Sequence, residues 1–382
     1  MKLLEHKAKI ILTKYGIPTP NGGLAKNPDQ AREIAAKIKP PFAVKAQVLV
    51  AGRGKAGGIL FADSPADVEN IANKLLNMQI KGMPVRSVRV EEKIQVKKEL
   101  YFGITIDRAR RSYVAIASEV GGMEIEEIAA KTPEKILKTF TNPQLGFHPF
   151  HARQIAKKLG YLGRRISELG KIFERLYHAC MDYDAELIEM NPLTETMDGK
   201  FMATDARIII DDNALFRHPE FQKRVLEGES ELTPQELEAM KNGLAYVKLD
   251  GSIGVIGNGA GLVMATLDTI QYYGGKPANF LDVGGGAPSE KIAAALKIVL
   301  SNPDVTALFM NILGGITRCD EVARGILEAK EEVEAAKPMV IRLVGTNEEE
   351  GKRMLTEAGI HVLESMEEAA QKVIKIAKQR GE

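Results

Sequence analysis

The sequence predicts two domains in series, an α+β domain followed by an α/β domain with a doubly wound parallel sheet. Three observations predict this order: strand-like runs lie close together in the first part of the chain, strands and helices alternate after Gly243, and helix-start signals separate the segments. A chain of 382 residues that is 45% apolar can bury more than one core. We therefore predict domains at 1–240 and 241–382.

Three helix starts combine an N-cap side chain with proline at the first helical position: Asn27-Pro28, Ser64-Pro65 and Thr233-Pro234. In the first domain we expect strands, most of them close enough for antiparallel pairing, at residues 42–50, 87–92, 100–106, 112–118, 185–190 and 201–210. The charged stretch at 221–241 predicts a connecting helix region. In the second domain we expect strands at 253–256, 280–283, 306–312, 339–344 and 361–363, alternating with helices such as 290–300 and 320–331.

Composition excludes several classes of protein. A net charge of +1 supplies no large basic field, so we expect no nucleic-acid partner. The first residues show no apolar signal region, and no window approaches 18 uninterrupted apolar residues, so we expect a cytoplasmic protein without a membrane span. Cys180 and Cys319 have no clustered His or Cys neighbours and are expected to be free thiols in a reducing compartment.

A glycine-rich loop with basic residues follows the strand expected to contain Lys45. It contains Gly52-Arg53-Gly54 and Lys55. Glycines let backbone N–H groups approach an anion closely, and the basic side chains supply charge. The loop lacks the spacing of a P-loop, so we interpret it as a polyphosphate-binding loop of another kind. These residues alone are equally compatible with a mobile glycine hairpin whose lysines are solvated.

A second candidate site lies at the end of the strand expected at 185–190. Read with period two, Glu189 and Asn191 share one face. A hairpin through Asp198-Gly199 would return the chain to Asp205, so that carboxylate and amide oxygens converge. Hard oxygen ligands suit Mg²⁺, which fills its remaining positions with phosphate and water. The alternative is a strand pair with a polar outer face, which does not explain why apolar strands run into these polar residues.

In the second domain, Gly257-Asn258-Gly259-Ala260-Gly261 follows a strand and opens an apolar helix, which favours an anion at the helix N-terminus. The spacing resembles a loose dinucleotide fingerprint, but the required acid about 20 residues on is missing, because Asp282 is too far away and belongs to its own glycine loop. Simple tight-turn glycines are the alternative. Neighbouring loops are expected at Gly284-Gly285-Gly286 and Gly314-Gly315-Ile316-Thr317.

Eight motifs stand in order along nearly all of the chain. They are Leu4-Glu5-His6 with Lys14-Tyr15-Gly16-Ile17-Pro18, the loop 52–58, Lys98-Glu99-Leu100-Tyr101, Glu189-Met190-Asn191-Pro192-Leu193, Asn213-Ala214-Leu215-Phe216-Arg217, Asn258-Gly259-Ala260-Gly261-Leu262, Asn279-Phe280-Leu281-Asp282-Val283-Gly284-Gly285-Gly286, and Gly314-Gly315-Ile316 with Arg318-Cys319-Asp320. In this order they resemble the β-subunit family of succinate–CoA ligase (succinyl-CoA synthetase), ADP-forming type.

The resemblance implies a two-lobed ATP-grasp domain followed by a flavodoxin-like CoA-ligase domain. It implies reversible phosphoryl transfer from Mg–ATP to a histidine, coupled to interconversion of succinate and CoA with succinyl-CoA in the citric acid cycle. None of the chain's histidines lies in a glycine-flanked loop like the family's phosphohistidine segment; they are His6, His148, His151, His178, His218 and His361. The nucleophile is therefore expected from an α-subunit, which also binds CoA, in an αβ or α₂β₂ enzyme.

The resemblance also implies site residues. Nucleotide contacts are expected from Lys45, Gly52, Arg53, Gly54, Glu91, Ile94 and Glu99. Orientation of the partner histidine is expected from Glu189 and Glu33, although Glu33 also fits a polar helix face. Contacts with the carboxylate substrate are expected from Asn258, Gly315, Ile316 and Thr317. Mg²⁺ is expected on Asn191 and Asp205.

Several alternatives stay open at this point. Relatives that use malate, citrate or acetate share most of these motifs, and the sequence does not decide between adenine and guanine nucleotides. Leu49-Val50-Ala51 departs from the His or Gly common before the loop, which could alter the phosphate contacts. An ATP-grasp carboxylate–amine ligase would share the first domain but would not need the 257–261 helix start. A non-catalytic nucleotide-binding scaffold would not need Asn191 or Asp205.

Overall fold

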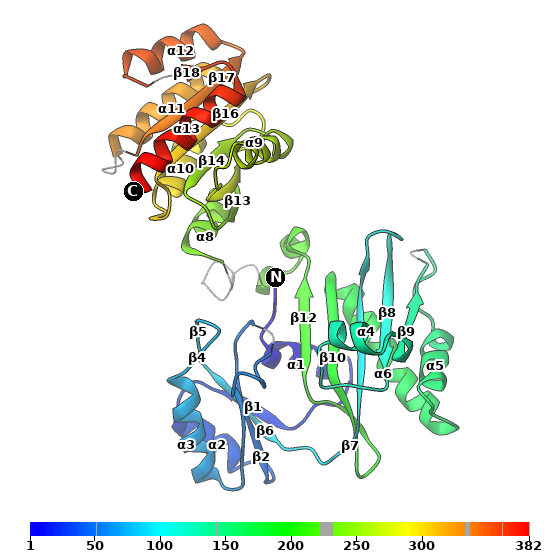
Figure 1. Cartoon of the computed structure of the whole chain (residues 1–382). Coiled ribbons are helices and arrows are strands. Elements are labelled where there is room, and N and C mark those ends of the chain that lie inside the picture. Colours follow the sequence, from blue (N-terminus) through cyan, green and yellow to red (C-terminus); the bar gives the residue numbers. More distant parts are fainter. Residues whose placement is uncertain (51, 143, 222–231, 333–336, 361, 382) are drawn as a thin grey trace. The chain divides into compact units, whose positions relative to one another are not determined.

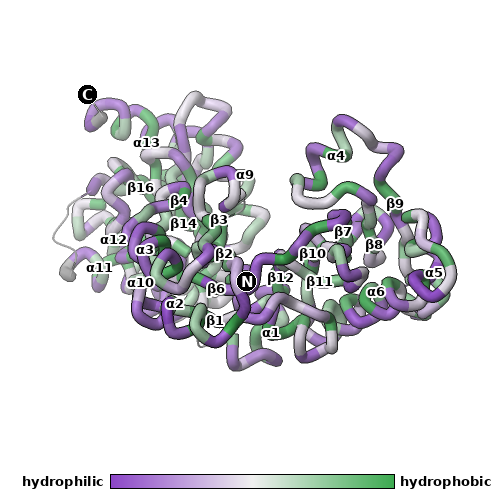
Figure 2. The backbone as a smooth tube through the Cα atoms, turned by 90° about the horizontal axis from the view of Figure 1, so that it is seen from below, coloured by the Kyte–Doolittle hydropathy of each residue, from purple (hydrophilic) through white to green (hydrophobic). Residues whose placement is uncertain are grey.

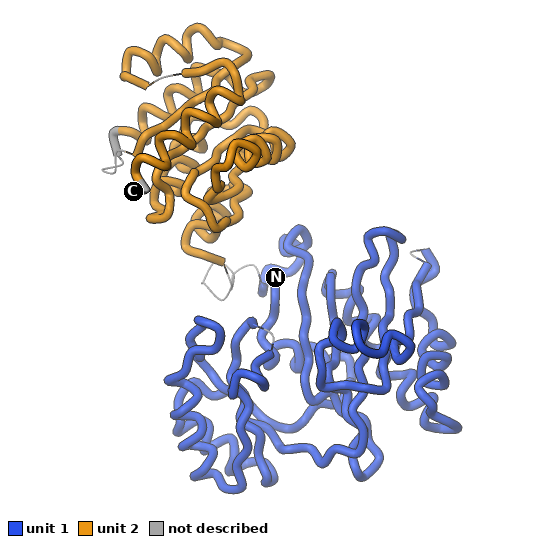
Figure 3. The backbone as a smooth tube through the Cα atoms, in the orientation of Figure 1, with its two compact units in different colours: residues 1–223 blue, residues 224–382 orange. Residues whose placement is uncertain are grey.

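The computed structural model describes residues 1–50, 52–142, 144–221, 232–332, 337–360 and 362–381. It divides into two compact units, Met1–Lys223 and Arg224–Glu382 (Figures 1 and 3). Helix α8 (Pro234–Lys241), which we expected to precede the domain boundary, packs on β13 (Ala245–Lys248), and its Ala239 joins the core of the second unit. Residues 222–231 of the expected connecting segment lie outside the described residues. A boundary near residue 240 therefore stays a prediction.

The first unit begins with a small antiparallel sheet whose strand order is β1-β6-β2-β3. Its strands are β1 (Gly22–Ala25), β2 (Phe42–Ala46), β3 (Ile59–Ala62) and β6 (Val88–Glu92), with a short pair β4 (Gln79–Ile80) and β5 (Met83–Pro84). Helices α2 (Pro28–Ala35) and α3 (Pro65–Leu76) pack against each other and cover this sheet. Val44, Val90 and Val68 are fully buried between them, which makes this layer a small independent core.

The predicted helix starts are confirmed. The Asn27 side chain accepts the N–H of Gln30 at 2.9 Å, and Ser64 Oγ accepts that of Asp67 at 3.2 Å. Thr233 Oγ1 accepts the N–H of Glu236 at 3.2 Å, and the Glu236 carboxylate accepts the Thr233 N–H at 2.7 Å, which completes a capping box.

A second antiparallel sheet of six strands completes the first unit, in the order β11-β10-β7-β8-β9, with β12 also paired to β10. Its strands are β7 (Val96–Asp107), β8 (Ser112–Ser118), β9 (Ile136–Phe140), β10 (Ala185–Thr196), β11 (Phe201–Ala203) and β12 (Ala206–Ile210). Other helices of this unit are α1 (Glu5–Lys14), α4 (Ile125–Lys131), α5 (Pro149–Lys158) and α6 (Arg164–Asp182), with 3₁₀ turns η1 (Pro133–Lys135) and η2 (Asp212–Arg217).

The hairpin predicted through Asp198-Gly199 is confirmed, because β10 and β11 pair antiparallel. The single strand predicted at 201–210 is wrong in one respect, since it divides into β11 and β12. The division falls at Thr204 and Asp205, where the Asn191 N–H bonds to the Asp205 carbonyl at 3.2 Å and Thr204 Oγ1 donates to the Pro192 carbonyl at 3.0 Å. The register between β10 and β7 also shifts between Met190 and Leu193. This bulge interrupts the strand beside the predicted metal ligands.

The second unit has a sheet in the order β13-β15-β14-β16-β17-β18. Its strands are β14 (Ile253–Gly257), β15 (Asn279–Asp282), β16 (Ala307–Gly314), β17 (Met339–Gly345) and β18 (Val362–Leu363), beside β13. The pairs among β14 to β18 are parallel, as predicted, whereas the edge strand β13 is antiparallel to β15. His361, which began one predicted strand, lies outside the described residues.

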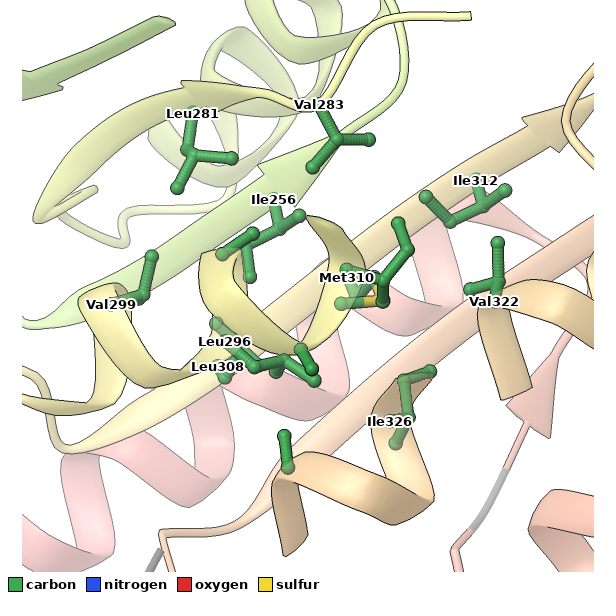
Figure 4. Packing of buried hydrophobic residues seen from close by; sticks show 14 of the residues in the cluster. Ile256, Leu281, Val283, Leu296, Val299, Leu308, Met310, Ile312, Val322 and Ile326 are labelled. Atoms are coloured by element: carbon green, nitrogen blue, oxygen red, sulfur yellow. The ribbon is translucent and has the colours of Figure 1, made fainter. Parts of the chain in front are cut away.

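Helices cover both faces of this sheet. One core cluster contains residues of α10 (Ser289–Leu300) and α11 (Cys319–Glu332), and Figure 4 shows Leu296 and Ile326 from these helices near Met310 of β16. The other contains residues of α9 (Ala260–Tyr272) and α13 (Met366–Gly381), the second of which alternates hydrophobic and hydrophilic residues along its length (Figure 2). Helix α12 (Glu348–Glu357) packs on α11. The predicted doubly wound arrangement is therefore confirmed.

Among the described helices, none has an apolar stretch long enough to cross a bilayer.

Candidate active site

A cavity of about 370 Å³ lies in the first unit and collects residues from distant parts of the chain. The predicted site residues that line it are Gly52, Arg53, Gly54, Glu99, Glu189, Asn191 and Asp205. Lys45 and Glu91 do not line it but lie in a buried charge cluster that reaches the cavity through Glu5 and Arg53. Ile94 follows β6 and does not line the cavity, and Glu33 is exposed on α2.

Arg53 links the glycine loop to the strand that carries Asp205. Its Nη2 donates to both Asp205 carboxylate oxygens, at 2.8 and 2.9 Å, and lies 2.8 Å from Glu5 Oε2. Burial alone would lower the pKa of Arg53, but the Asp205 and Glu5 carboxylates raise it. A buried guanidinium at the wall of a cavity, with acidic partners that hold it in place, is a preorganised donor for phosphate oxygens.

Lys45 lies behind Arg53 in a cluster of buried charges. Its Nζ contacts Glu91 Oε1 at 2.7 Å, Glu5 Oε1 at 3.1 Å and the carbonyl oxygen of Thr204 at 2.6 Å. Burial alone would lower the pKa of Lys45, but the two carboxylates raise it. The ammonium is therefore held in its charged form beside the loop, rather than projecting into the cavity.

Three members of this charge cluster were not predicted as site residues, namely Glu5, Lys9 and Arg89. Lys9 Nζ contacts Glu5 Oε1 and Glu91 Oε2, each at 2.7 Å, and Arg89 Nε contacts Glu91 Oε2 at 2.7 Å. Lys9 is only 1% exposed. Glu5 and Lys9 stand four residues apart on α1, and this spacing is a signal for an ion pair on a helix. That spacing usually marks a solvated pair, so their burial could not be predicted from it.

The predicted metal ligands Asn191 and Asp205 both reach the cavity. Asn191 Oδ1 accepts the Gly122 N–H at 2.9 Å, and its Nδ2 donates to the Met123 carbonyl at 2.8 Å. Among the described residues, no group of three or more His, Cys, Asp or Glu side chains is placed to hold a metal. One amide and one carboxylate oxygen fit Mg²⁺ that takes its other ligands from phosphate and water. Such a cation would have to share Asp205 with Arg53 or displace it.

Glu189 faces the same cavity from β10. Its Oε2 accepts a hydrogen bond from the Tyr101 hydroxyl at 2.8 Å, and its Oε1 lies 3.9 Å from Arg207 Nη1. Burial raises the pKa of Glu189, while the Tyr101 hydrogen bond and the Arg207 charge act in the opposite direction. Since the Tyr101 hydroxyl uses one acceptor site of Oε2, Oε1, with Arg207 at 3.9 Å, keeps the greater capacity to accept from an incoming donor.

In the second unit, two predicted loops meet at the carboxyl ends of β14 and β16. Asn258 Nδ2 donates to the Leu313 carbonyl at 2.9 Å and to Thr317 Oγ1 at 3.2 Å, and Asn258 Oδ1 accepts the Leu313 N–H at 2.9 Å. Ile316 projects into solvent with 86% of its surface exposed. These loops, with Gly315, form one polar platform beside an exposed apolar side chain.

Asp282 organises the neighbouring glycine loops of this platform. Its Oδ1 accepts the N–H of Gly259 at 2.6 Å and that of Gly284 at 2.7 Å. Gly259 has φ +111°, a conformation that side chains disfavour, and it directly precedes α9. The acid that we rejected as part of a dinucleotide fingerprint therefore fixes two turns of the predicted anion site.

Comparison with known proteins adds independent information. The family model of the ATP-grasp domain matches residues 2–195, and that of the CoA-ligase matches residues 256–376. The chain is 50% identical over 378 residues to succinate–CoA ligase (ADP-forming) subunit beta from Ignicoccus hospitalis, covering 99% of this chain and 100% of that protein. The protein of the same name from Pyrobaculum islandicum is 47% identical over 381 residues, covering 99% of this chain and 100% of that protein.

A solved structure shows the same fold over the full length. ATP citrate lyase from Methanothrix soehngenii, in complex with citrate and coenzyme A, superposes with a TM-score of 0.74 at 19% sequence identity. The match covers 99% of each chain. At this identity the likeness concerns the fold alone.

Proposed function

Because the chain belongs to the family of ADP-forming succinate–CoA ligase β subunits, we propose that it binds Mg–ATP in the first-unit cavity and transfers the γ-phosphoryl group to a histidine of an α-subunit partner. The observation that carries this proposal is the convergence of Arg53, Asp205, Asn191 and Glu189 on one cavity. Phosphoryl transfer depends mainly on positioning and charge neutralisation. It therefore needs groups that bind phosphate, ligands for the metal and an acid that orients the histidine.

Separate residues are proposed to contact the nucleotide and the metal. Arg53 and the backbone of Gly52 and Gly54 bind phosphate oxygens. Lys45 adds positive charge from the buried cluster next to the loop. Asn191 and Asp205 would hold Mg²⁺, which neutralises phosphate charge when bound. Contacts to the rest of the nucleotide are proposed for Glu91, Ile94 and Glu99.

Glu189 is proposed to accept a hydrogen bond from one ring nitrogen of the partner histidine. This bond fixes the tautomer, so that the other nitrogen carries the lone pair that attacks the γ-phosphorus. The bond from the γ-phosphorus to the bridging oxygen breaks, and ADP leaves with that electron pair. Glu33 is proposed in a supporting role, although it is exposed and does not line the cavity.

The second-unit platform is proposed to bind the acid substrate, through Asn258, Gly315, Ile316 and Thr317. The phosphohistidine would pass its phosphoryl group to the carboxylate, and CoA bound to the α-subunit would then displace phosphate to form the thioester. Succinate is the proposed acid and ADP/ATP the proposed nucleotide pair, in an αβ or α₂β₂ assembly of the cytoplasm. Malate, citrate or acetate, and GDP, are the alternatives for the same machinery.

The test is ADP release that depends on ATP, CoA and succinate, measured for this chain alone and after co-expression with an α-type subunit. We expect activity only with the partner, together with acid-labile phosphate on that partner. A panel of the four acids then assigns the substrate. Activity of this chain alone, or a stable complex that is inactive with every acid, would contradict the divided phosphohistidine relay and favour a carboxylate–amine ligase or a scaffold.

A further inference from the structure

Tyr101 lies directly behind Glu189, on the neighbouring strand. The side chain of Tyr101 is 2% exposed, and its hydroxyl donates to Glu189 Oε2 at 2.8 Å. Strands β7 and β10 pair antiparallel, with Gly103 opposite Glu189. Tyr101 and Gly103 are two residues apart on β7 and therefore share the face that Glu189 occupies on β10.

Gly103 provides the space for this contact. A Cβ atom at position 103 would lie 2.6 Å from the Tyr101 hydroxyl oxygen and 3.1 Å from Glu189 Cβ. The first distance is closer than side-chain atoms approach one another, so any larger residue would displace the hydroxyl. Glycine weakens a strand interior, and its presence there commonly marks a close approach. Here the close approach is that of the phenol to the carboxylate.

We propose that Tyr101 is a positioning residue for phosphoryl transfer, which holds Glu189 Oε2 so that Oε1 is directed to the partner histidine, and that Gly103 makes this arrangement possible. A buried aromatic ring packed within the sheet fixes the carboxylate more firmly than a solvent-exposed donor could. The inference rests on the proposed role of Glu189 and extends it to two residues that do not line the cavity.

The chain contains a matched control for this contact. Tyr161 donates its hydroxyl to Glu195 Oε2 at 2.7 Å, and Glu195 belongs to the same strand β10. Neither residue lines the cavity. Tyr161→Phe thus removes the same type of hydrogen bond from the same strand without touching Glu189.

The experiment measures single-turnover phosphorylation of the partner histidine by ATP in the purified complex, together with nucleotide affinity and thermal stability. Tyr101→Phe should slow phosphorylation about 10- to 100-fold, the effect of losing a hydrogen bond to a charged group, and leave nucleotide affinity within about twofold. Tyr161→Phe should leave both within about twofold. A wild-type rate for Tyr101→Phe would overturn the inference.

A double-mutant cycle tests whether Tyr101 acts through Glu189. Adding Tyr101→Phe to Glu189→Ala should cause no further loss, because the residue it positions is already gone. A further loss of the same size would overturn the inference while leaving the role of Glu189 intact. A wild-type rate for Glu189→Ala alone would instead overturn the role proposed for Glu189, and the inference with it.

Gly103→Ala is a second test of the same contact: alone it keeps the inference testable if Tyr101→Phe does not yield a stable complex, and with a stable Tyr101→Phe the two changes are also combined. This variant should slow phosphorylation because the new methyl group displaces the Tyr101 hydroxyl. In the Tyr101→Phe background the same alanine should cost less, since the oxygen that it meets at 2.6 Å is absent. A wild-type rate for Gly103→Ala, or an equal cost in both backgrounds, would overturn the proposed role of Gly103.

Discussion

Arg53 and Asp205 form an ion pair between segments 152 residues apart, in which the single nitrogen Nη2 of the arginine lies 2.8 and 2.9 Å from the two carboxylate oxygens. The first is the proposed phosphate ligand and the second a proposed metal ligand. In this structure the proposed phosphate ligand and the proposed metal ligand are therefore bonded to each other. Binding of Mg–ATP would exchange this protein contact for contacts with phosphate and cation, so that the charges are in place before the substrate arrives.

Replacement of Asp205 tests the metal assignment. Asp205→Ala should lower ADP release by the complex at least about 10- to 100-fold, the loss expected even for an indirect metal contact, and should raise the Mg²⁺ concentration needed for half activity. The measurement is a Mg²⁺ titration of steady-state activity. Asp198→Ala is the matched control, because Asp198 is an exposed hairpin residue paired with Lys200. Near wild-type activity of Asp205→Ala would show that the metal assignment is wrong.

Neutralising Glu5 should destabilise the first unit. Glu5→Gln removes a buried charge that lies within 2.7 to 3.1 Å of Lys9, Lys45 and Arg53. Breaking a buried ion pair leaves its partners uncompensated, and we expect a loss of about 3–5 kcal/mol in the free energy of unfolding. Urea unfolding followed by circular dichroism measures it. Glu69→Gln, which breaks the exposed pair with Arg32, should cost less than about 1 kcal/mol. Equal effects would contradict the burial of the cluster.

The stability of the first unit should fall in acid. The surrounding cations lower the pKa of Glu5 and Glu91 below their ordinary value of 4.5, against the opposing effect of burial. The unfolded chain then binds more protons than the folded chain near and below pH 4.5, so this stabilisation is present above that pH and is lost as the pH falls through the folded-state pKa. Glu189, whose pKa is raised, acts in the opposite sense.

Urea midpoints measured from neutral pH down into this acid range check that expectation. Glu5→Gln should show a shallower decline than the wild type, because one of the two depressed carboxyls is missing. Parallel declines of the two proteins would mean that Glu5 does not have a depressed pKa in the folded chain.

Asn258→Asp should affect the acid substrate selectively. The substitution replaces the donor that bonds Leu313 and Thr317 with an anionic oxygen, which repels both the Leu313 carbonyl and a substrate carboxylate. We expect the KM for the acid to rise at least about tenfold. Phosphorylation of the partner histidine by ATP should be unchanged, because the cavity proposed to bind ATP lies in the first unit. Asn242→Asp, at the end of α8, is the control, and a KM unchanged by Asn258→Asp would contradict the proposed substrate site.

The two cysteines should resist alkylation in the folded protein. Both are free and buried, and burial raises the pKa of Cys180 to about 12 and that of Cys319 to about 11. Relative to the ordinary value of 9.0, Cys180 has about a thousandfold less reactive thiolate. Mass spectrometry after iodoacetamide treatment at mildly alkaline pH should find neither residue modified, and both modified in denaturant. Rapid labelling of native Cys180 would show that its surroundings open.

The sequence could predict the fold because its signals are local. The caps at Asn27, Ser64 and Thr233 and the alternation of apolar strands with helices each depend on a few neighbouring residues. Strand β13 was not predicted, because this short edge strand depends on antiparallel contacts with β15 that no short segment encodes. The break at Thr204 and Asp205 was missed for the same reason, since its hydrogen bonds are made with Asn191 and Pro192 at the bulge in β10.

Part of the candidate site could also be predicted, since glycines, basic residues and oxygen ligands carry recognisable chemistry. The charge cluster was different: Glu5 and Glu91 are 86 positions apart in the sequence and are linked through Lys9 of α1 and Lys45 of β2, each of which contacts both carboxylates. Nothing in the pattern around Lys9 distinguishes a lysine buried among carboxylates from one in solvent. The support of Glu189 by Tyr101 required the strand register, which the sequence alone does not fix.

Strand β10 carries Glu189 and Asn191 toward the cavity and, beyond its bulge, Glu195 toward Tyr161. Its side chains alternate between faces, so a single inserted or deleted residue before Ile188 would turn the acid and the amide into the apolar layer and bring Ile188 and Met190 to the cavity. Away from Glu189 and Asn191, changes of residue type in this strand can therefore be accommodated one at a time, whereas changes of length cannot. Over evolutionary time this segment should diversify by substitution, with insertions and deletions confined to its hairpin.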